Sequence, residues 1–426
     1  MNSIQIKTVT DGFNHSIRDP LWSDINLTEG YKKLFYSYPM QKLTRIKQLG
    51  PAYLLYPGAV HSRSSHSLGV YHLTRLIIIS LLNNSSTLGV IPHFKPKNIK
   101  ALLAAAMLHD LGHFPYAHAL KDVVTAQHEQ LGASFIKENS ELISIIENDI
   151  GTSVDAVVKI IDEDISTTDE DLLFFRTILS GTLDPDKLDY LNRDAHFCGV
   201  LYGSQDVSYI IRNLVYTQNG KLAIPIEAMS SVEHLLFAKY SMYKSVYWHK
   251  TTRCATAMIK KALLLALEEN LFSEKELYDL DDESFKSLFD KNRGTLPEIL
   301  FTKVRDNKLL SLKQTFDLAS LKEIDNKTKT ELELILLKTL IPYYPNLNYS
   351  EVILDIPEKI SFEADIPILD SDGSLKPFNE VNTLFTKEVV ATFVCSLRKG
   401  RLFLPNEVDS AKVQPLLNEV LSAYGR

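Results

Sequence analysis

Residues 98–120 read NIKALLAAAMLHDLGHFPYAHAL and carry the strongest structural signal in the chain. The Ala and Leu residues of the first half favour a helix, and Asn98 is a suitable N-cap for it. Apolar residues occupy broad faces of this helix, which indicates that it is buried inside a bundle. His109 and Asp110 follow at the helix end, where adjacent side chains can reach one ion because the helix no longer separates them. We therefore expect a helical bundle with polar chemistry at the end of its buried helix.

The composition is that of an ordinary globular protein rich in helix. The 426 residues are 45% apolar and 23% charged, which excludes a disordered chain. The 17 glycines and 17 prolines are fewer than usual, so long helices are favoured and a collagen-like chain is excluded. The formal charge of −7 argues against indiscriminate nucleic-acid binding. We expect no nucleic-acid partner.

Cysteines and apolar runs indicate a cytoplasmic protein. Cys198, Cys254 and Cys395 lie far apart, which is neither a disulfide framework nor a zinc motif. The first 20 residues contain no apolar signal segment. The longest apolar runs, 76–82 and 101–108, are far shorter than the ~20 residues of a membrane span. We expect no membrane partner.

Hydrophobic periodicity places further helices along the chain. Residues 1–60 are expected to be irregular, and Asp184-Pro185 is expected to cap and start a helix. Asn219-Gly220 between two short apolar runs predicts a β-hairpin. Helical patterns cover 67–82, 128–148, 153–162, 169–180 and, as one long helix, 229–269.

The pattern changes after about residue 270. Shorter amphipathic helices are expected to about residue 340, followed by strands at 351–357 and 384–397 with a turn at Ser371-Asp372-Gly373. We therefore expect a catalytic core at 1–270. Residues 271–426 are expected to form a regulatory or oligomerisation region.

Histidine and aspartate gather at four places in the apolar helical segments. His66, His109, Asp110 and Asp186 supply two imidazoles and two carboxylates, and His128-Glu129 is a further pair. Such a set suits Mn, Fe, Mg or Zn as a divalent cofactor. A lone His-Asp dipeptide is more often a pair of solvated or hydrogen-bonded side chains. Four such elements in this order favour a metal site.

Five stretches of the chain resemble the HD-domain superfamily of metal-dependent phosphohydrolases. Within it they are most similar to the deoxynucleoside triphosphate (dNTP) triphosphohydrolases, which include the SAM-and-HD-domain enzyme of animals and its bacterial relatives. The stretches are RIKQLGPAYLLYPGAVHSRSSHSLGVYHL (45–73), LHDLGHFPYAHAL (108–120), HEQ (128–130), SGTLDPDKLDYLNRDAHFCGV (180–200) and AKYSMYKSVYWHK (238–250). The resemblance implies a mainly α fold: an HD-domain helical bundle with a small β-hairpin and a smaller α+β C-terminal region.

The resemblance also implies the chemistry. Family members cleave dNTP between the 5′ oxygen and the α-phosphorus, which releases deoxynucleoside and inorganic triphosphate. The implied metal ligands are His66, His109, Asp110 and Asp186. A bound metal polarises the phosphoryl oxygen, and a general acid protonates the leaving 5′ alkoxide.

The family motifs assign further catalytic and substrate-binding residues. Arg63 and His113 are implied to face the phosphates, His118 to donate the proton, and His128 and Glu129 to lie near the metal. The alternatives are a surface arginine at 63, and histidines at 113 and 118 that only hydrogen-bond the backbone of the core. The implied substrate contacts are Lys187 and Lys239 at phosphate, Gln48, Leu49 and Tyr190 at the sugar, Asp194 at base or sugar, and Tyr243 and Tyr247 along sugar and base. A tyrosine stripe at helical spacing is otherwise more often core packing.

Several positions depart from the family pattern. Ser64-Ser65, Phe114 and Thr44 differ from common relatives, and Thr44 stands where the animal enzyme has an arginine for its regulatory nucleotide. Lys121 replaces the acidic residue three positions after the proton donor, so Asp122 or Glu129 is expected to take that role.

Three functions therefore compete. The first is a dNTP triphosphohydrolase that forms a homo-oligomer, a dimer or tetramer, with a nucleotide activator as a further partner. The second is another nucleotide phosphodiesterase or nucleotidase. The third is a catalytically weak nucleotide sensor.

Overall fold

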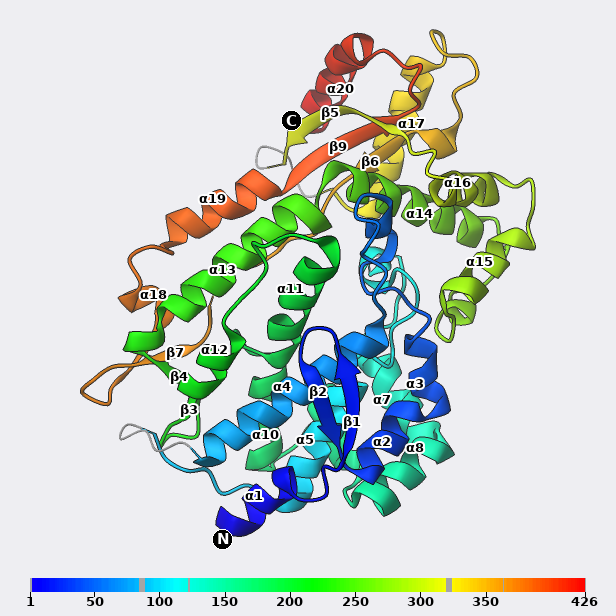
Figure 1. Ribbon diagram of the computed structural model, residues 1–426. Helices are drawn as coiled ribbons and strands as arrows, with labels where there is room; N and C mark the ends of the chain where they lie inside the picture. The colour runs from blue at the N-terminus through cyan, green and yellow to red at the C-terminus, as the bar shows by residue number, and fades with distance from the viewer. Residues whose placement is uncertain (1, 84–88, 122, 319–323, 363, 426) are drawn as a thin grey trace.

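The main core of the protein is a bundle of helices around α5 (Pro96–Leu108) (Figure 1). Ala and Leu residues make most of α5 apolar, and from Asn98 onward every residue of the helix except Lys100 is buried. It packs between α4 (Arg63–Asn83) and α9 (Val154–Ile161), while α11 (Pro185–Cys198) packs on α4 and α10 (Glu170–Leu179) covers α9. The mainly α fold is confirmed. The computed structural model describes residues 2–83, 89–121, 123–318, 324–362 and 364–425.

The buried helix starts earlier than its sequence indicates. Its first residue is Pro96, whose missing N–H costs nothing at this position, and Lys95 is the N-cap. The prediction that Asn98 caps the helix is wrong. The Asn98 amide instead donates to Asp169 at 3.2 Å and to Asp171 at 3.0 Å, which ties α5 to the start of α10.

The first 60 residues are regular, contrary to the prediction. A helix and a β-hairpin come first, with register from His15↔Leu27 to Asp19↔Ser23, and they pack against the bundle through buried Val9, Ile25 and Leu27. The turn residues that suggested a loop lie between these short elements. The helices and strands of this region are α1 (Asn2–Thr10), β1 (His15–Asp19), β2 (Ser23–Leu27), α2 (Glu29–Tyr36), α3 (Tyr38–Leu43) and the 3-10 helix η1 (Gly50–Leu54).

The predicted long helix at 229–269 is broken in the middle. α13 (Ser230–Met242) runs into the π-helix η4 (Tyr243–Tyr247), and α14 (Lys250–Glu268) starts afresh after it. Trp248 N donates to Tyr243 O at 2.8 Å, which widens the last turn, and extended His249 caps the new helix. Because helix-forming residues lie on both sides, the sequence carries no clear signal of this break.

The predicted hairpin at Asn219-Gly220 is confirmed and joins the C-terminal part of the chain. β3 (Val215–Tyr216) pairs antiparallel with β4 (Leu222–Pro225), and Gly220 takes a positive φ of 70°. β7 (Pro367–Leu369) adds to β4 in parallel, and β8 (Leu375–Pro377) completes the order β3-β4-β7-β8. The turn predicted at 371–373 connects β7 and β8.

The C-terminal sheet lies beside α14 at the top of Figure 1. It has the order β5-β9-β6, antiparallel throughout, in which β5 is Ser311–Asp317 and β9 is Lys399–Leu404. β6 (Ile353–Asp355) lies inside the predicted strand 351–357. The predicted strand at 384–397 is wrong because its main part is helix α19 (Lys387–Leu397), which Thr386 caps. Its partly buried Val390, Phe393 and Val394 recur at helical spacing.

The remaining elements connect these units. They are α6 (Ala117–Leu120), α7 (His128–Glu138), α8 (Ser140–Ser144), η2 (Ile145–Ile150), α12 (Val207–Asn213), η3 (Ile226–Ala228), η5 (Glu274–Leu277), α15 (Asp282–Asp290), α16 (Leu296–Arg305), β5 (Ser311–Asp317), α17 (Asn326–Leu340), η6 (Tyr349–Glu351), α18 (Phe378–Val381), β9 (Lys399–Leu404) and α20 (Ser410–Gly425). Among the helices described, none has the length and apolar character that crossing a membrane requires.

Candidate metal centre

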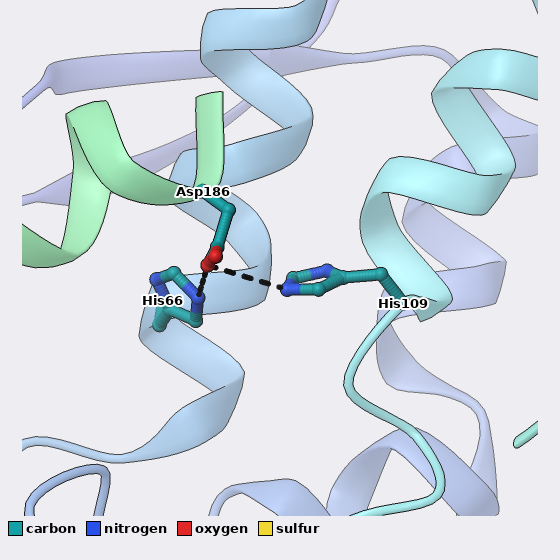
Figure 2. Close-up of side chains that lie close together, drawn as sticks. All are labelled: His66, His109 and Asp186. Atoms are coloured by element: carbon teal, nitrogen blue, oxygen red, sulfur yellow. Dashed lines mark hydrogen bonds and ion pairs between the residues drawn. The ribbon is translucent and has the colours of Figure 1, made fainter. Parts of the chain in front are cut away.

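Three polar side chains from three helices meet at one point. His66 comes from the first turn of α4, His109 directly follows α5, and Asp186 lies in the first turn of α11 (Figure 2). One ligand atom from each lies within 4.8 Å of the others. His66 Nε2 is 2.9 Å and His109 Nε2 is 3.8 Å from Asp186 Oδ1. The N-cap Asp184, which accepts from Lys187 N at 2.6 Å, fixes the turn that presents Asp186.

Hydrogen bonds on the far side of both rings orient them toward this point. His109 Nδ1 donates to Ala106 O at 2.9 Å, and His66 Nδ1 donates to Asp189 Oδ2 at 2.8 Å. Each imidazole therefore turns its Nε2 to the centre. Within the described residues, His109 Nε2 is buried and has no hydrogen-bond partner. An orphaned imidazole nitrogen beside a second imidazole and a carboxylate fits a divalent ion.

Asp110 borders this group and links it to a second one. Its Oδ1 lies 3.4 Å from His109 Nε2, while its Oδ2 accepts from Arg63 Nη1 at 2.7 Å. His113 Nδ1 is 3.2 Å from Asp110 Oδ1, and the rings of His113 and His128 are 4.0 Å apart. Asp110, His113 and His128 thus form another cluster with metal-ligand spacing.

The other predicted catalytic residues divide between described and undescribed parts of the chain. His128 Nε2 is 3.0 Å from Glu129 Oε1. His113 is buried and contacts Asp110. His118 lies on α6, but its side chain and the whole of Asp122 fall outside the described residues.

Asp189 orients His66 by a hydrogen bond on the side of the ring that faces away from the centre, a role that was not predicted from the sequence. Its Oδ2 accepts from His66 Nδ1 and from Arg193 Nε, both at 2.8 Å, and its Oδ1 accepts from Arg193 Nη2 at 2.9 Å and Trp22 Nε1 at 2.5 Å. Asp189 and Arg193 are both fully buried. A Cβ on Gly69 would lie 1.8 Å from Asp189 Oδ1, so only glycine lets α4 and α11 approach this closely. The spacing of Asp186, Asp189 and Arg193 along one helix face was the available signal.

The surrounding charges keep the carboxylates ionised. Burial lowers the pKa of His66, but hydrogen bonds to Asp186 and Asp189 outweigh it and raise that pKa to about 10. Burial also acts to raise the pKa of Asp110, yet neighbouring cations, His113 foremost, hold that pKa well below its usual range. The centre therefore offers carboxylate oxygens to a cation.

A single cavity of about 1140 Å³ opens from this centre. Its lining includes nearly all of the predicted site residues, although they come from six separate stretches of the chain. His113 is not among the lining residues. Those that do line the cavity are Gln48, Leu49, Arg63, His66, His109, Asp110, His128, Glu129, Asp186, Lys187, Tyr190, Asp194, Lys239, Tyr243 and Tyr247.

Two lysines bring positive charge to the cavity. Lys187 Nζ pairs with Asp184 and donates to Gly181 O at 2.9 Å. Lys239 Nζ donates to Ser361 O at 2.7 Å. Burial, helped by repulsion from Lys187, lowers the pKa of Lys239 to about 8.

The tyrosines both pack against one another and face the cavity. The rings of Tyr243 and Tyr247 meet edge to face at 5.1 Å, and Tyr190 meets Tyr247 at 6.3 Å. Tyr247 OH donates to Asp194 Oδ2 at 2.7 Å. Core packing and substrate contact are therefore not exclusive for this stripe.

The C-terminal part of the chain supplies another wall of the cavity, which the sequence did not indicate. Residues 355–361 and Arg398 line it. Arg398 Nε donates to Pro357 O at 2.9 Å, and Arg253 Nη1 is 3.8 Å from Glu358 Oε2. These contacts hold the wall segment against α14 and α19.

Two family descriptions match the chain: an HD domain over residues 63–173 and an HD-associated region over 205–391. The chain belongs to the HD-domain phosphohydrolase superfamily. The match to the HD domain contains His66, His109 and Asp110, whereas Asp186 lies between the two matched regions.

Relatives of this HD-domain protein include the uncharacterised protein YwfO of Bacillus subtilis, which is 32% identical over 250 residues, 59% of this chain and 54% of that protein. The deoxynucleoside triphosphate triphosphohydrolase SAMHD1 of Homo sapiens is 26% identical over 280 residues, 59% of this chain and 44% of the human protein. The chain thus spans about half the length of these two relatives. The crystal structure of a phosphohydrolase from Bacteroides thetaiotaomicron shares the fold, with a TM-score of 0.71 and 23% identity over 92% of this chain and 100% of that one.

Proposed function

We propose that this HD-domain protein is a metal-dependent dNTP triphosphohydrolase that converts dNTP to deoxynucleoside and inorganic triphosphate. The observation that carries the proposal is the single cavity that joins the His66, His109 and Asp186 group to Lys187 and Lys239. A metal group beside half-buried lysines suits a polyphosphate. The name of the human relative supports the same substrate.

The residues divide along the cavity by chemistry. Arg63, Lys187 and Lys239 supply positive charge for the triphosphate. Asp194 and Gln48 supply hydrogen-bond acceptors for a sugar hydroxyl, and Leu49 packs against the sugar. Tyr190, Tyr243 and Tyr247 supply the flat apolar surfaces that a sugar and base require.

His66, His109, Asp110 and Asp186 would hold the divalent ion, which when bound acts as a Lewis acid toward the phosphate. The chain's own residues do the remaining work. Arg63, fixed by Asp110, presents its guanidinium to the phosphates, and His118 gives its proton to the 5′ oxygen as the deoxynucleoside leaves. Glu129 keeps His128 oriented at the edge of the cavity.

Product analysis tests the proposal. The purified protein, with its metal content measured, is incubated with dNTPs and NTPs singly and mixed, and products are separated by ion-exchange chromatography. We expect inorganic triphosphate and deoxynucleoside. Diphosphate or monophosphate products would indicate another phosphodiesterase or nucleotidase. Tight nucleotide binding without turnover under several metals would indicate a sensor.

Variants at the centre test the ligand assignment. His109→Ala and Asp186→Ala should each lose bound metal and turnover while circular dichroism shows that the fold is kept. His93→Ala, at an exposed loop histidine, is the matched control and should retain both. Full metal occupancy in either ligand variant would contradict the assignment.

Assembly and compartment are further parts of the proposal. We propose a cytoplasmic homo-oligomer, a dimer or tetramer, with a nucleotide activator as an additional partner. The three cysteines are free in the structure, which supports a reducing compartment.

A further inference from the structure

His61 connects two hydrogen-bonding residues of the cavity that lie far apart in the chain. Its Nε2 donates to Asp194 Oδ1 at 2.8 Å. Its backbone carbonyl accepts from Gln48 N at 3.0 Å. The side chain is 1% exposed, and its ring stacks on Phe197 at 4.6 Å with an interplanar angle of 18°. His61 itself is not among the residues that line the cavity.

Both connected residues line the cavity and carry acceptor capacity that is not used. Asp194 accepts one hydrogen bond on each oxygen, from His61 and from Tyr247, and a carboxylate can accept about four. Gln48 Oε1 is buried and has no hydrogen-bond partner among the described residues. Two convergent acceptors in a cavity select a ligand that carries hydroxyl donors, because an analogue without them leaves buried polar atoms unpaired.

We infer that His61 is a positioning residue for sugar recognition, which fixes the Asp194 carboxylate so that it accepts the hydrogen bond of the 3′ hydroxyl of a deoxynucleotide beside Gln48. This inference rests on the proposed function. His61 acts through Asp194, because its imidazole reaches that carboxylate and does not face the cavity. Without the imidazole N–H, Tyr247 is the one described residue that still donates to the carboxylate, which is then free to turn away from the sugar.

The test compares dATP with its 3′-deoxy analogue ddATP. His61→Phe keeps a ring against Phe197 but removes the donor, His61→Leu is a second variant without a donor, and His61→Gln restores an amide N–H of similar reach. We measure kcat and KM for both nucleotides. We also measure their binding calorimetrically with metal chelated, which needs no turnover.

We expect the wild-type protein to prefer dATP over ddATP by tenfold or more. His61→Phe and His61→Leu should reduce this preference to about threefold or less, mainly through a higher KM for dATP, with ddATP almost unchanged. His61→Gln should recover most of it. If His61 had a merely structural role, its loss would weaken the binding of both nucleotides equally.

The outcomes separate the two claims. If the wild-type protein cleaves no dNTP, the proposed function fails. The calorimetric preference for dATP over ddATP then tests by itself whether His61 positions the sugar site. If it cleaves dNTP and the variants without a donor keep the wild-type preference for dATP, His61 does not position the sugar site. Equal losses for dATP and ddATP would also overturn the inference.

Discussion

Asp189→Asn should weaken both the metal centre and the fold, because every acceptor position of this carboxylate is used. Four donors point at it: His66 Nδ1, two guanidinium nitrogens of Arg193 and Trp22 Nε1. An amide offers one oxygen and one NH₂ group. Whichever way it turns, two buried donors meet an N–H group in place of an acceptor.

The size of the effect follows from this count. Each buried donor left without an acceptor costs about 1–3 kcal/mol, and Arg193 loses one of the two carboxylates that neutralise it, with Asp19 at 2.8 Å remaining. We expect the free energy of unfolding to fall by about 3–5 kcal/mol, as for other buried ion pairs that lose one partner. With the NH₂ group toward His66, the ring must change tautomer and place its proton on Nε2. Metal affinity should therefore drop about 10–100-fold.

Two measurements check this prediction. Competition with a fluorescent chelator gives the metal dissociation constant, and denaturant unfolding gives the change in midpoint. Asp24→Asn is the matched control because Asp24 forms an exposed ion pair with Arg18 at 3.1 Å. It should change neither quantity appreciably. Unchanged metal affinity and midpoint in Asp189→Asn would refute the supporting role of Asp189.

Four further predictions concern substrate, pH, proton transfer and assembly. Deoxyribose should be preferred over ribose by a few kcal/mol because the Gln48-Leu49 pair crowds the 2′ position, and equal rates with dATP and ATP would contradict this. KM should rise as the pH increases through about 8, because Lys239 then loses the charge that binds phosphate, and Lys239→Arg should abolish the rise because arginine stays protonated. His118→Ala should cut turnover about 10²-fold or more with metal still bound, Asp122→Ala should reduce turnover less, and Lys121→Glu should raise it. Normal turnover in His118→Ala would mean that another residue donates the proton, with His113 the next candidate. Light scattering should show a dimer or tetramer, and a fully active monomer at micromolar concentration would exclude this.

Local signals predicted the elements that depend on local physics. The Ala- and Leu-rich run gave α5, Asp184-Pro185 gave the start of α11, and Asn219-Gly220 gave the β3–β4 hairpin. Caps, turns and propensity act within a few residues, so a sequence shows them directly.

The elements that were predicted wrongly depend on tertiary contacts. The break before α14 is stabilised where Tyr243 packs on Trp248 at 5.2 Å and Arg401 Nη2 donates to Trp248 O at 3.0 Å. Arg401 comes from β9, more than 150 positions along the chain. The valines of α19 suggested a strand, and the Thr386 cap together with the packing of Phe393 decides for a helix.

The site divides in the same way. Most of the residues named from the family motifs line one cavity, His113 does not, and their catalytic and binding roles stay predictions. Asp189, His61 and the wall at 355–361 were missed because their roles arise from distant contacts, such as that of Asp189 with Trp22. The side chain proposed as proton donor, His118, stays a prediction.

Hydrolysis of dATP in ¹⁸O-labelled water shows whether the protein cleaves dNTP at the α-phosphorus. We expect inorganic triphosphate that carries one ¹⁸O atom and deoxyadenosine that carries none, because water attacks the α-phosphorus and the 5′ oxygen leaves with the sugar. The reaction should stop when metal is stripped and return when it is restored. Diphosphate or monophosphate as the product, or label in the deoxyadenosine, would show that the protein is not a dNTP triphosphohydrolase of this kind.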